Sequence, residues 1–408
     1  MSSLDFVSDR SPFGRTDYPR VALLSAGHLI NDLYGNFITS LMPYLVIRGD
    51  ITTTAAGLVL LVYLFGSSVL QPIFGLISDR TGRRGFAVIG PVWVGLAAAA
   101  ITRANTSVML LLIAGIGGLG TAAFHPQAAS MIDSLSPTNK GRSMAYFSMG
   151  GNIGFALGPV AAAVVATVGL VWSPLMLLPG AAIGLGLARY APHVGRSEES
   201  FAVADLWDTV RIAWKQINLV VSVIAIRSAA QYALIIFLPL YYHLRGHPAE
   251  LGSYFAFVLS LAGAIGGLAG GHFSDLYGRR RVVVLSLIVA APLLFVTLLV
   301  PVPFVWPLVA LSGAALLASN SVTVVQGQEL LPRHRGLASG LTLGFGFGLS
   351  GVIASGLTAL SDHIGVENAI FAAPGLALLA AMVAAFVRNP TRASSVTTGG
   401  AETVRVSR

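Results

Sequence analysis

Long apolar runs separated by short polar turns dominate the chain. The runs cover 20–47, 53–77, 84–103, 107–132, 142–167 and 171–189, and then 216–243, 249–274, 281–300, 304–331, 336–359 and 366–387. Each run has the length of a helix that crosses the hydrocarbon core of a bilayer, which takes about 20 residues. The pattern therefore predicts an all-α membrane protein with twelve transmembrane helices.

One longer polar stretch divides the predicted helices into two sets of six. We therefore expect five segments, which are a cytoplasmic N-terminal tail at 1–19, a six-helix bundle at 20–189, a cytoplasmic linker at 190–215, a second six-helix bundle at 216–387 and a cytoplasmic C-terminal tail at 388–408.

The two predicted bundles share a sequence repeat. The segment from Gly75 to Arg84 reads GLISDRTGRR, and the segment from Gly271 to Arg280 reads GHFSDLYGRR. Each copy forms the turn that follows the second helix of its bundle. Repeats of this kind across two membrane halves are typical of transporters that rock around a central site. We therefore expect two pseudo-symmetric bundles around a central cavity.

Composition and charge agree with a membrane protein. Mean hydropathy is +0.77 and only 10% of the residues are charged, which excludes an ordinary soluble domain. The chain has no cysteine, which excludes disulfides and thiolate chemistry. A net charge of +8 could indicate a nucleic-acid partner. However, most of the 25 basic residues fall on one side of the predicted helices. This bias predicts that both termini are cytoplasmic and that no nucleic acid is bound.

The repeated loop carries the resemblance to a known family. Through it the chain resembles the major facilitator superfamily over nearly its whole length. Within that superfamily it resembles the fosmidomycin-resistance type of exporter, through GHLIND at 27–32, LQP at 70–72, FHP at 124–126 and the segment 150–159. The resemblance implies twelve helices, a central cavity, proton-driven drug export, a location in the cell (inner) membrane and a monomer.

The fifth predicted helix contains the antiporter motif of such exporters, with Gly154, Gly158 and Pro159. In the family this motif usually ends Gly-Pro-x-x-Gly-Gly, whereas Ala162 and Ala163 take the places of the last two glycines here. The residues remain small, so close packing of helices is retained. The departure weakens the motif as an indication of antiport.

The resemblance assigns the repeated loop to a gate that joins the two halves on the cytoplasmic side. A carboxylate just past a helix end can pair with arginine or cap a neighbouring helix, and glycine permits close packing and tight turns. The alternative is a solvated loop with ordinary positive-inside charge. The predicted gate residues are Gly75, Asp79, Arg80, Gly82, Arg83, Asp275, Gly278 and Arg279.

Charged residues at membrane depth are costly and usually mark a transport pathway. Asp32 lies near the middle of the first predicted helix, with His28 four residues earlier on the same face. Arg227 lies at a similar depth in the seventh helix. Asp32 is either a proton carrier or a structural anion paired with Arg227 or His28. Arg227 is either a receptor for an anionic substrate or the other half of that pair.

A second histidine, His125, precedes Pro126 in the fourth predicted helix. It is either a proton relay or a packed histidine at a kink. The predicted proton-coupling residues are Asp32, His28 and His125. These three residues could in principle hold a metal, but nothing further in the sequence supports one, so we predict neither a metal nor a cofactor. The predicted substrate-binding residues are Asn31, Arg227, Gln231, Tyr232, Asn152, Tyr34 and Asn320.

The sequence favours a proton-coupled exporter of small amphiphilic or anionic drugs, with protons, a small molecule and the lipid bilayer as partners. The alternative is a proton-coupled uptake symporter for an organic anion, since the superfamily uses similar parts in both directions. Motifs of hydrolases and metalloproteases are absent from the sequence, so an enzyme is not predicted. A transport-dead sensor or scaffold is not favoured, because the stretch 190–215 is too short to be an appended soluble domain. A passive channel is not favoured either, because the repeated loop has no evident use in a static pore.

Overall fold

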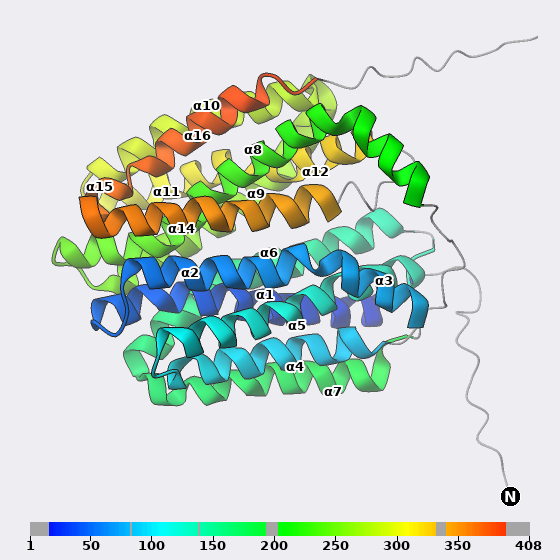
Figure 1. Cartoon of the computed structure of the whole chain (residues 1–408), viewed down its shortest axis with the longest axis horizontal. Coiled ribbons are helices and arrows are strands. Elements are labelled where there is room, and N and C mark those ends of the chain that lie inside the picture. The colour runs from blue at the N-terminus through cyan, green and yellow to red at the C-terminus, as the bar shows by residue number, and fades with distance from the viewer. Residues whose placement is uncertain (1–15, 82–83, 138, 193–202, 332–339, 389–408) are drawn as a thin grey trace, which may run out of the picture.

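The computed structural model describes residues 16–81, 84–137, 139–192, 203–331 and 340–388. Over these residues the chain folds into a bundle of long, roughly parallel helices without a β-strand (Figure 1). The first half of the chain forms α1 (Tyr18–Ile47), α2 (Thr53–Leu64), η1 (Phe65–Val69), α3 (Gln71–Thr81), α4 (Gly85–Ala100), η2 (Ile101–Arg103), α5 (Ser107–Ser134), α6 (Lys140–Val168), η3 (Leu170–Met176) and α7 (Leu177–Tyr190).

The second half repeats this arrangement. It forms α8 (Val203–Leu244), α9 (Ala249–Tyr277), α10 (Arg279–Leu299), α11 (Val302–Leu317), α12 (Ser319–Leu330), η4 (Gly340–Phe345), α14 (Gly346–Ile364), α15 (Val366–Ala369) and α16 (Ala372–Ala384). Helix α8 begins inside the range that the sequence assigned to the linker. We call the end of the bundle where α1 begins and α16 ends the tail side, and the opposite end the loop side (Figure 1).

The membrane fold is confirmed. Eleven helical stretches of the described residues are long and apolar enough to cross a membrane. Helix α1 adds a twelfth pass of 30 residues, but polar residues such as Asn31, Asp32 and Asn36 lower its hydropathy. Large apolar side chains lie on the outside of the bundle, for example Leu185 at 74% and Phe386 at 71% exposure. Such a surface is suited to lipid, because soluble proteins rarely expose so much apolar area.

Glycines of α6 bring that helix into contact with the backbone of α1. A Cβ atom at Gly154 would lie 2.0 Å from the carbonyl oxygen of Leu29, and one at Gly158 would lie 2.6 Å from the Cβ of Asn36. Close approach of this kind is how small residues join membrane helices. Pro159 supplies no amide to the carbonyl of Phe155, and the side-chain amide of Asn36 donates to that oxygen instead at 2.7 Å. The structure therefore places the predicted antiporter motif against α1.

Two π-helical turns face each other between the halves. Turn η1 follows α2 in the first half, and turn η4 precedes α14 in the second. A Cβ at Gly344 of η4 would lie 3.0 Å from the carbonyl oxygen of Ser68 in η1. Isolated π-turns inside longer helices are frequent at functional sites, and here they mark the contact between the two halves.

Hydrogen bonds join the halves on the loop side. The hydroxyl of Tyr44 in α1 bonds to that of Ser253 in α9 at 2.8 Å. The carboxylate of Asp362 in α14 accepts the backbone amide of Thr54 at 3.0 Å and the hydroxyls of Thr53 and Thr54. Asp362 thereby caps the N-terminus of α2 from the opposite half of the molecule. These contacts hold the two halves together on the loop side.

Candidate functional site

Three titratable side chains meet halfway along α1 and α5. Asp32 and His28 lie one turn apart on α1, with the Nε2 of His28 3.1 Å from Oδ2 of Asp32. His125 reaches across from α5 and places its Nε2 3.0 Å from Oδ1 of Asp32 and 3.0 Å from the Nε2 of His28. We call these residues the Asp–His triad. The structure thus brings together the three residues that the sequence predicted for proton coupling.

Backbone carbonyls fix the orientation of both imidazole rings. The Nδ1 of His28 lies 2.8 Å from the carbonyl oxygen of Phe147 in α6. The Nδ1 of His125 lies 3.1 Å from the carbonyl oxygen of Thr121, one turn earlier in α5. A carbonyl oxygen only accepts hydrogen bonds, so each Nδ1 carries the hydrogen and each Nε2 points into the triad.

Helix α6 leaves room for the triad by carrying a glycine beside it. A Cβ at Gly151 would lie 2.4 Å from the ring of His28 and 2.9 Å from Oδ2 of Asp32. The ring of Phe147 stacks on that of His28 with centroids 4.1 Å apart. The side chains of His28, Asp32 and His125 retain 12%, 20% and 22% exposure. The triad is therefore packed against α6 on one side but is not fully buried.

The donor atoms of the triad also match the types that bind metals. Among the described residues, His28, Asp32 and His125 offer ligand atoms that all lie within 4.8 Å of one another. Two imidazole nitrogens and a carboxylate oxygen form a donor set that zinc uses in catalytic sites.

Arg227 forms a separate polar centre on α8. Its side chain is 1% exposed. One guanidinium nitrogen donates to Oδ1 of Asn320 in α12 at 2.9 Å, and the other terminal nitrogen lies 3.4 Å from Oε1 of Gln231. Its Nε has no hydrogen-bond partner. No salt bridge joins Arg227 to a carboxylate among the residues that the structure describes, so the alternative Asp32–Arg227 pair is not formed in this conformation.

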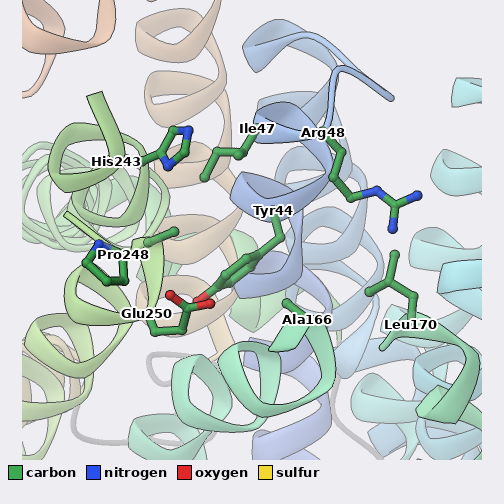
Figure 2. Close-up of a pocket in the computed structure, with 9 residues that line it drawn as sticks. Tyr44, Ile47, Arg48, Ala166, Leu170, His243, Pro248 and Glu250 are labelled. Atoms are coloured by element: carbon green, nitrogen blue, oxygen red, sulfur yellow. The ribbon is translucent and has the colours of Figure 1, made fainter. Parts of the chain in front are cut away.

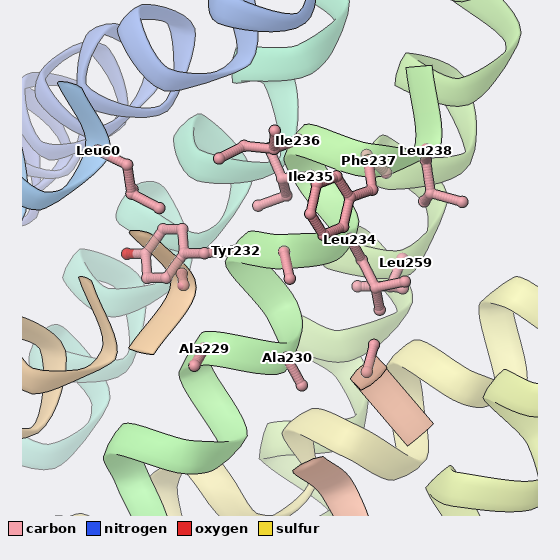
Figure 3. Close-up of a cluster of buried hydrophobic side chains, with 14 of the residues drawn as sticks. Leu60, Ala229, Ala230, Tyr232, Leu234, Ile235, Ile236, Phe237, Leu238 and Leu259 are labelled. Atoms are coloured by element: carbon pink, nitrogen blue, oxygen red, sulfur yellow. The ribbon is translucent and has the colours of Figure 1, made fainter. Parts of the chain in front are cut away.

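Tyr232 lies between the two centres. It points from α8 toward Leu60 of α2 in the other half (Figure 3), and its ring packs edge-on against Phe155 of α6 with centroids 6.0 Å apart. The phenol is close enough to interact electrostatically with both Asp32 and Arg227. Tyr232 therefore lies within electrostatic range of the carboxylate of one half and the guanidinium of the other.

The remaining predicted substrate residues occupy different environments. Asn31 is fully buried and donates to Oδ1 of Asp32 at 3.2 Å. Tyr34 is buried against α7, where its hydroxyl donates to the carbonyl of Met176 and accepts the amide of Gly180 at 2.8 Å. Asn152 is exposed on α6. Tyr34 is thus held in the wall of the first half rather than presented to the centre.

The repeated loop is described fully only in its second copy. Gly278, at φ +94°, ends α9 and lets α10 start at once. Arg279 pairs with Asp275, donates to Ser274 at 2.6 Å and lies 3.3 Å from Glu329 of α12. This copy therefore ties α9, α10 and α12 together within its own half.

In the first copy, Gly75 lies in α3 and packs against Pro126, 3.5 Å from where its Cβ would be. The side chains of Asp79 and Arg80, and all of Gly82 and Arg83, lie outside the described residues.

A pocket that the sequence did not predict lies between the halves at the loop side (Figure 2). It has a volume of about 270 Å³. Its lining comes from the C-terminal end of α1, from α6 and from η3 of the first half, and from the end of α8, the following turn and the start of α9 in the second half. The lining residues are Tyr44, Ile47, Arg48, Ala166, Leu170, His243, Pro248, Ala249 and Glu250. Tyr44 follows Asp32 by three turns of α1, about 18 Å at the rise of an α-helix. The pocket is therefore separate from the triad.

Comparison with known proteins identifies the family. The model of the Major Facilitator Superfamily matches residues 24–355 and 256–407, so the chain belongs to this superfamily. The chain is 29% identical over 384 residues to an uncharacterized MFS-type transporter of Bacillus subtilis, covering 90% of this chain and 92% of the relative. It is 27% identical over 362 residues to the fosmidomycin resistance protein of Escherichia coli, covering 86% and 89%.

Solved structures show the same fold. The D-xylose–proton symporter matches with a TM-score of 0.71 at 14% identity, covering 92% of this chain and 98% of the symporter. A bacterial homologue of the human lysosomal transporter Spinster matches with a TM-score of 0.71 at 15% identity, covering 91% and 96%. The protein is accordingly a membrane transporter for small molecules and not an enzyme.

Proposed function

We propose that this transporter is a proton-coupled antiporter that exports small amphiphilic or anionic compounds by alternating access. The environment of Arg227 carries the proposal. The guanidinium is 1% exposed, with an unbonded Nε and neutral amides as its hydrogen-bond partners, and no carboxylate in the described part of the chain pairs with it. Burial of an uncompensated charge costs several kcal/mol, on the order of 3–5 when a partner is removed from a buried pair. An anionic substrate supplies the missing charge.

The Asp–His triad is the proton site of this proposal. Its three groups change charge on protonation and lie on the half opposite Arg227. An anion bound at Arg227 offsets positive charge near the triad and by itself favours protonation of the triad. In this proposal, substrate and proton are therefore taken up in different conformations of the transporter, and alternation between these conformations gives antiport.

The name of one relative supports the substrate class. The Escherichia coli relative is called a fosmidomycin resistance protein, and fosmidomycin carries a phosphonate. A guanidinium fork matches the oxygens of a phosphonate or carboxylate. Gln231, Asn320, Tyr232 and Asn31 are the side chains that we assign to the rest of the substrate site, with Asn152 and Tyr34 further from it.

The repeated loop provides the tail-side gate in this proposal. Asp79 and Arg80 of the first copy are assigned to this gate from the sequence motif, and the pair of Arg279 and Asp275 supports the second copy. In this proposal the protein is a monomer in the cell membrane, and the gathering of basic residues on the tail side supports cytoplasmic termini.

The test is substrate-driven proton movement in liposomes that contain the purified protein and an enclosed pH dye. Fosmidomycin and a panel of organic anions and cations are added to wild type, to Asp32→Asn and to the matched control Asp50→Asn, whose carboxylate is half exposed and pairs with Arg48 on the loop side. We expect protons to move against the drug in wild type and Asp50→Asn, and not in Asp32→Asn.

The direction of proton movement separates the candidates. Protons that travel with the substrate would identify a symporter. Coupled movement that persists in Asp32→Asn would make Asp32 structural and leave His125 as the proton carrier to test next.

A further inference from the structure

We propose that the loop-side pocket binds a small organic amine, and that the bound amine holds the two halves of the transporter together (Figure 2). This site is separate from the Asp–His triad and from Arg227. Binding to it goes beyond the proposed function and can be measured without any transported substrate.

The walls of the pocket come from both halves of the molecule. Tyr44 and Leu170 belong to the first half, whereas Pro248 and Glu250 belong to the second. Beside the pocket, the hydroxyls of Tyr44 and Ser253 join the halves by a hydrogen bond of 2.8 Å. The pocket is therefore complete only while the halves are together on the loop side.

Glu250 brings a carboxylate to the pocket, and this carboxylate has no ion-pair partner among the residues that the structure describes. The side chain is half-buried in the first turn of α9, where the helix N-terminus favours a negative charge. Its carboxylate lies beside the hydroxyl end of Tyr44 (Figure 2) and interacts electrostatically with that phenol. A cation that enters the pocket can therefore pair with Glu250.

The basic residues of the lining do not supply this cation. The guanidinium of Arg48 lies 2.9 Å from the carboxylate of Asp50, and it points away from Glu250 (Figure 2). His243 is exposed at the end of α8 and forms no ion pair with Glu250. The charge of Glu250 thus remains uncompensated within the pocket.

The rest of the lining selects the body of the ligand. Its apolar residues are Ile47, Ala166, Leu170, Pro248 and Ala249. Tyr44 adds an aromatic ring, a group that attracts ammonium ions. Pockets for drug-sized molecules usually have about 300–1,000 Å³, so a volume of about 270 Å³ suits a smaller molecule. A bare metal ion is not favoured, because Ca²⁺ takes about six to eight oxygen ligands and the pocket offers one carboxylate. A compact apolar body that carries an ammonium group fits this lining.

An amine in this pocket acts on the conformation of the transporter. Because the pocket is complete only when the halves are together, the amine binds that conformation and not the one in which the halves separate. At a concentration of about ten times its Kd, the amine raises the population of the joined conformation about elevenfold relative to the separated one. Transport should therefore slow, and additional substrate should not relieve the inhibition.

The experiment is calorimetric titration of benzylammonium into the purified protein in detergent micelles. Benzyl alcohol has a similar shape without the charge, and benzoate carries the opposite charge. We expect benzylammonium to bind at least about tenfold more tightly than either, because its ammonium group gains a charge-assisted hydrogen bond to Glu250.

Two variants and a matched control locate the binding. Glu250→Gln keeps the shape of the side chain, so it should weaken benzylammonium about tenfold and leave benzyl alcohol unchanged. Ala166→Leu fills part of the pocket and should weaken both ligands. The control is Glu367→Gln, because Glu367 is an exposed carboxylate that pairs with Arg245 and does not line the pocket. Its affinity for benzylammonium should equal that of wild type, and thermal unfolding checks the fold of each variant.

Two sets of results would overturn the proposal. Equal affinity for benzylammonium and benzyl alcohol, or undiminished binding in Glu250→Gln, would remove the amine site. Inhibition of transport that additional substrate relieves would place the amine at the central site, and the pocket would then have no role in holding the halves together.

Transport measurements separate this site from the proposed antiport. Binding of benzylammonium is measured without substrate, so it stands even if drug addition moves no protons in liposomes, a result that contradicts only the antiporter proposal. If protons move against the drug but benzylammonium does not bind, the antiporter stands and the amine site fails.

Discussion

Helices α1 and α8 hold matching places in the two halves of the molecule, yet their polar centres differ in kind. The centre on α1 consists of a carboxylate and two imidazoles, held by Phe147, Thr121 and the space above Gly151. The centre on α8 is a single guanidinium held by two neutral amides. Imidazole and carboxylate groups gain and lose protons near neutral pH or in response to neighbours, whereas a guanidinium keeps its charge.

This difference divides the work between the halves. A site that changes charge suits an ion that must be taken up and released in each cycle. A site with a fixed charge suits a ligand that always arrives as an anion. Under the proposed function, proton and substrate would then bind at matching positions of the two halves, so a single relative movement of the halves could act on both sites.

The strongest test of the comparison removes the fixed charge. In Arg227→Met the substrate loses charge-assisted hydrogen bonds, each of about 1.5–3 kcal/mol, so affinity for an organic phosphonate should fall about 100-fold. Calorimetric titration of wild type, Arg227→Met and Arg227→Lys measures this, and unchanged affinity in Arg227→Met would remove Arg227 from the substrate site.

A second test disturbs the other centre without touching a titratable group. In Gly151→Ala the new methyl group would lie 2.4 Å from the ring of His28. Overpacking of this kind costs about 1–3 kcal/mol, so substrate-driven proton movement should fall about tenfold or more. The control is Gly356→Ala, whose added methyl group meets nothing within 4 Å. Equal activity of the two variants would mean that the triad tolerates displacement of His28.

A third test acts on the contact between the halves. Asp362→Ala removes the cap that α14 gives to α2, worth about 1 kcal/mol, and should shift the molecule about fivefold toward an open loop side. Because the chain has no cysteine, spin labels can be attached through Arg48→Cys and Glu367→Cys, two exposed positions on opposite halves. Distances between the labels that match those of the parent would show that the cap does not stabilise closure.

The smallest effect concerns the support of Arg227. Asn320→Ala removes the acceptor that lies 2.9 Å from the guanidinium of Arg227. The charge of Arg227 is kept, but the orientation of its side chain is less well fixed. Affinity for the phosphonate should fall about threefold, because the free energy lost lies near the lower end of the net contribution of one hydrogen bond, about 0.5–1.5 kcal/mol. A loss as large as that of Arg227→Met would instead make Asn320 a direct ligand of the substrate.

The helices were largely predictable from hydropathy, because each membrane pass leaves an apolar run of fixed length. The π-helical turns inside the helices and the start of α8 were not predictable in this way. Turns η1 and η4 leave no mark in an apolar run, since the hydrogen-bond pattern changes without a change of composition. The start of α8 at Val203 was missed because its first turns are polar.

The site was predictable only where its residues share a helix. His28 and Asp32 are four residues apart on α1, so their contact follows from helix geometry. The approach of His125 depends on how α5 packs against α1, which no spacing in the sequence reveals. Tyr34 is on the same helix as Asp32, but its hydroxyl meets the backbone of α7. The residue type alone does not predict that Tyr34 lies in the wall of the first half and not at its centre.

The glycine contacts between α6 and α1 have a mechanical consequence. Gly150, Gly154 and Gly158 press one backbone against the other with no side chain between them to yield. The two helices must therefore travel as a rigid body, and the carbonyl of Phe147 stays with the ring of His28 through the whole cycle. Tyr232, which comes from the other body, must instead slide across this surface. Relative movement of the two halves therefore takes place at their boundary, where Tyr232 packs against Phe155, while the contacts between α1 and α6 stay unchanged.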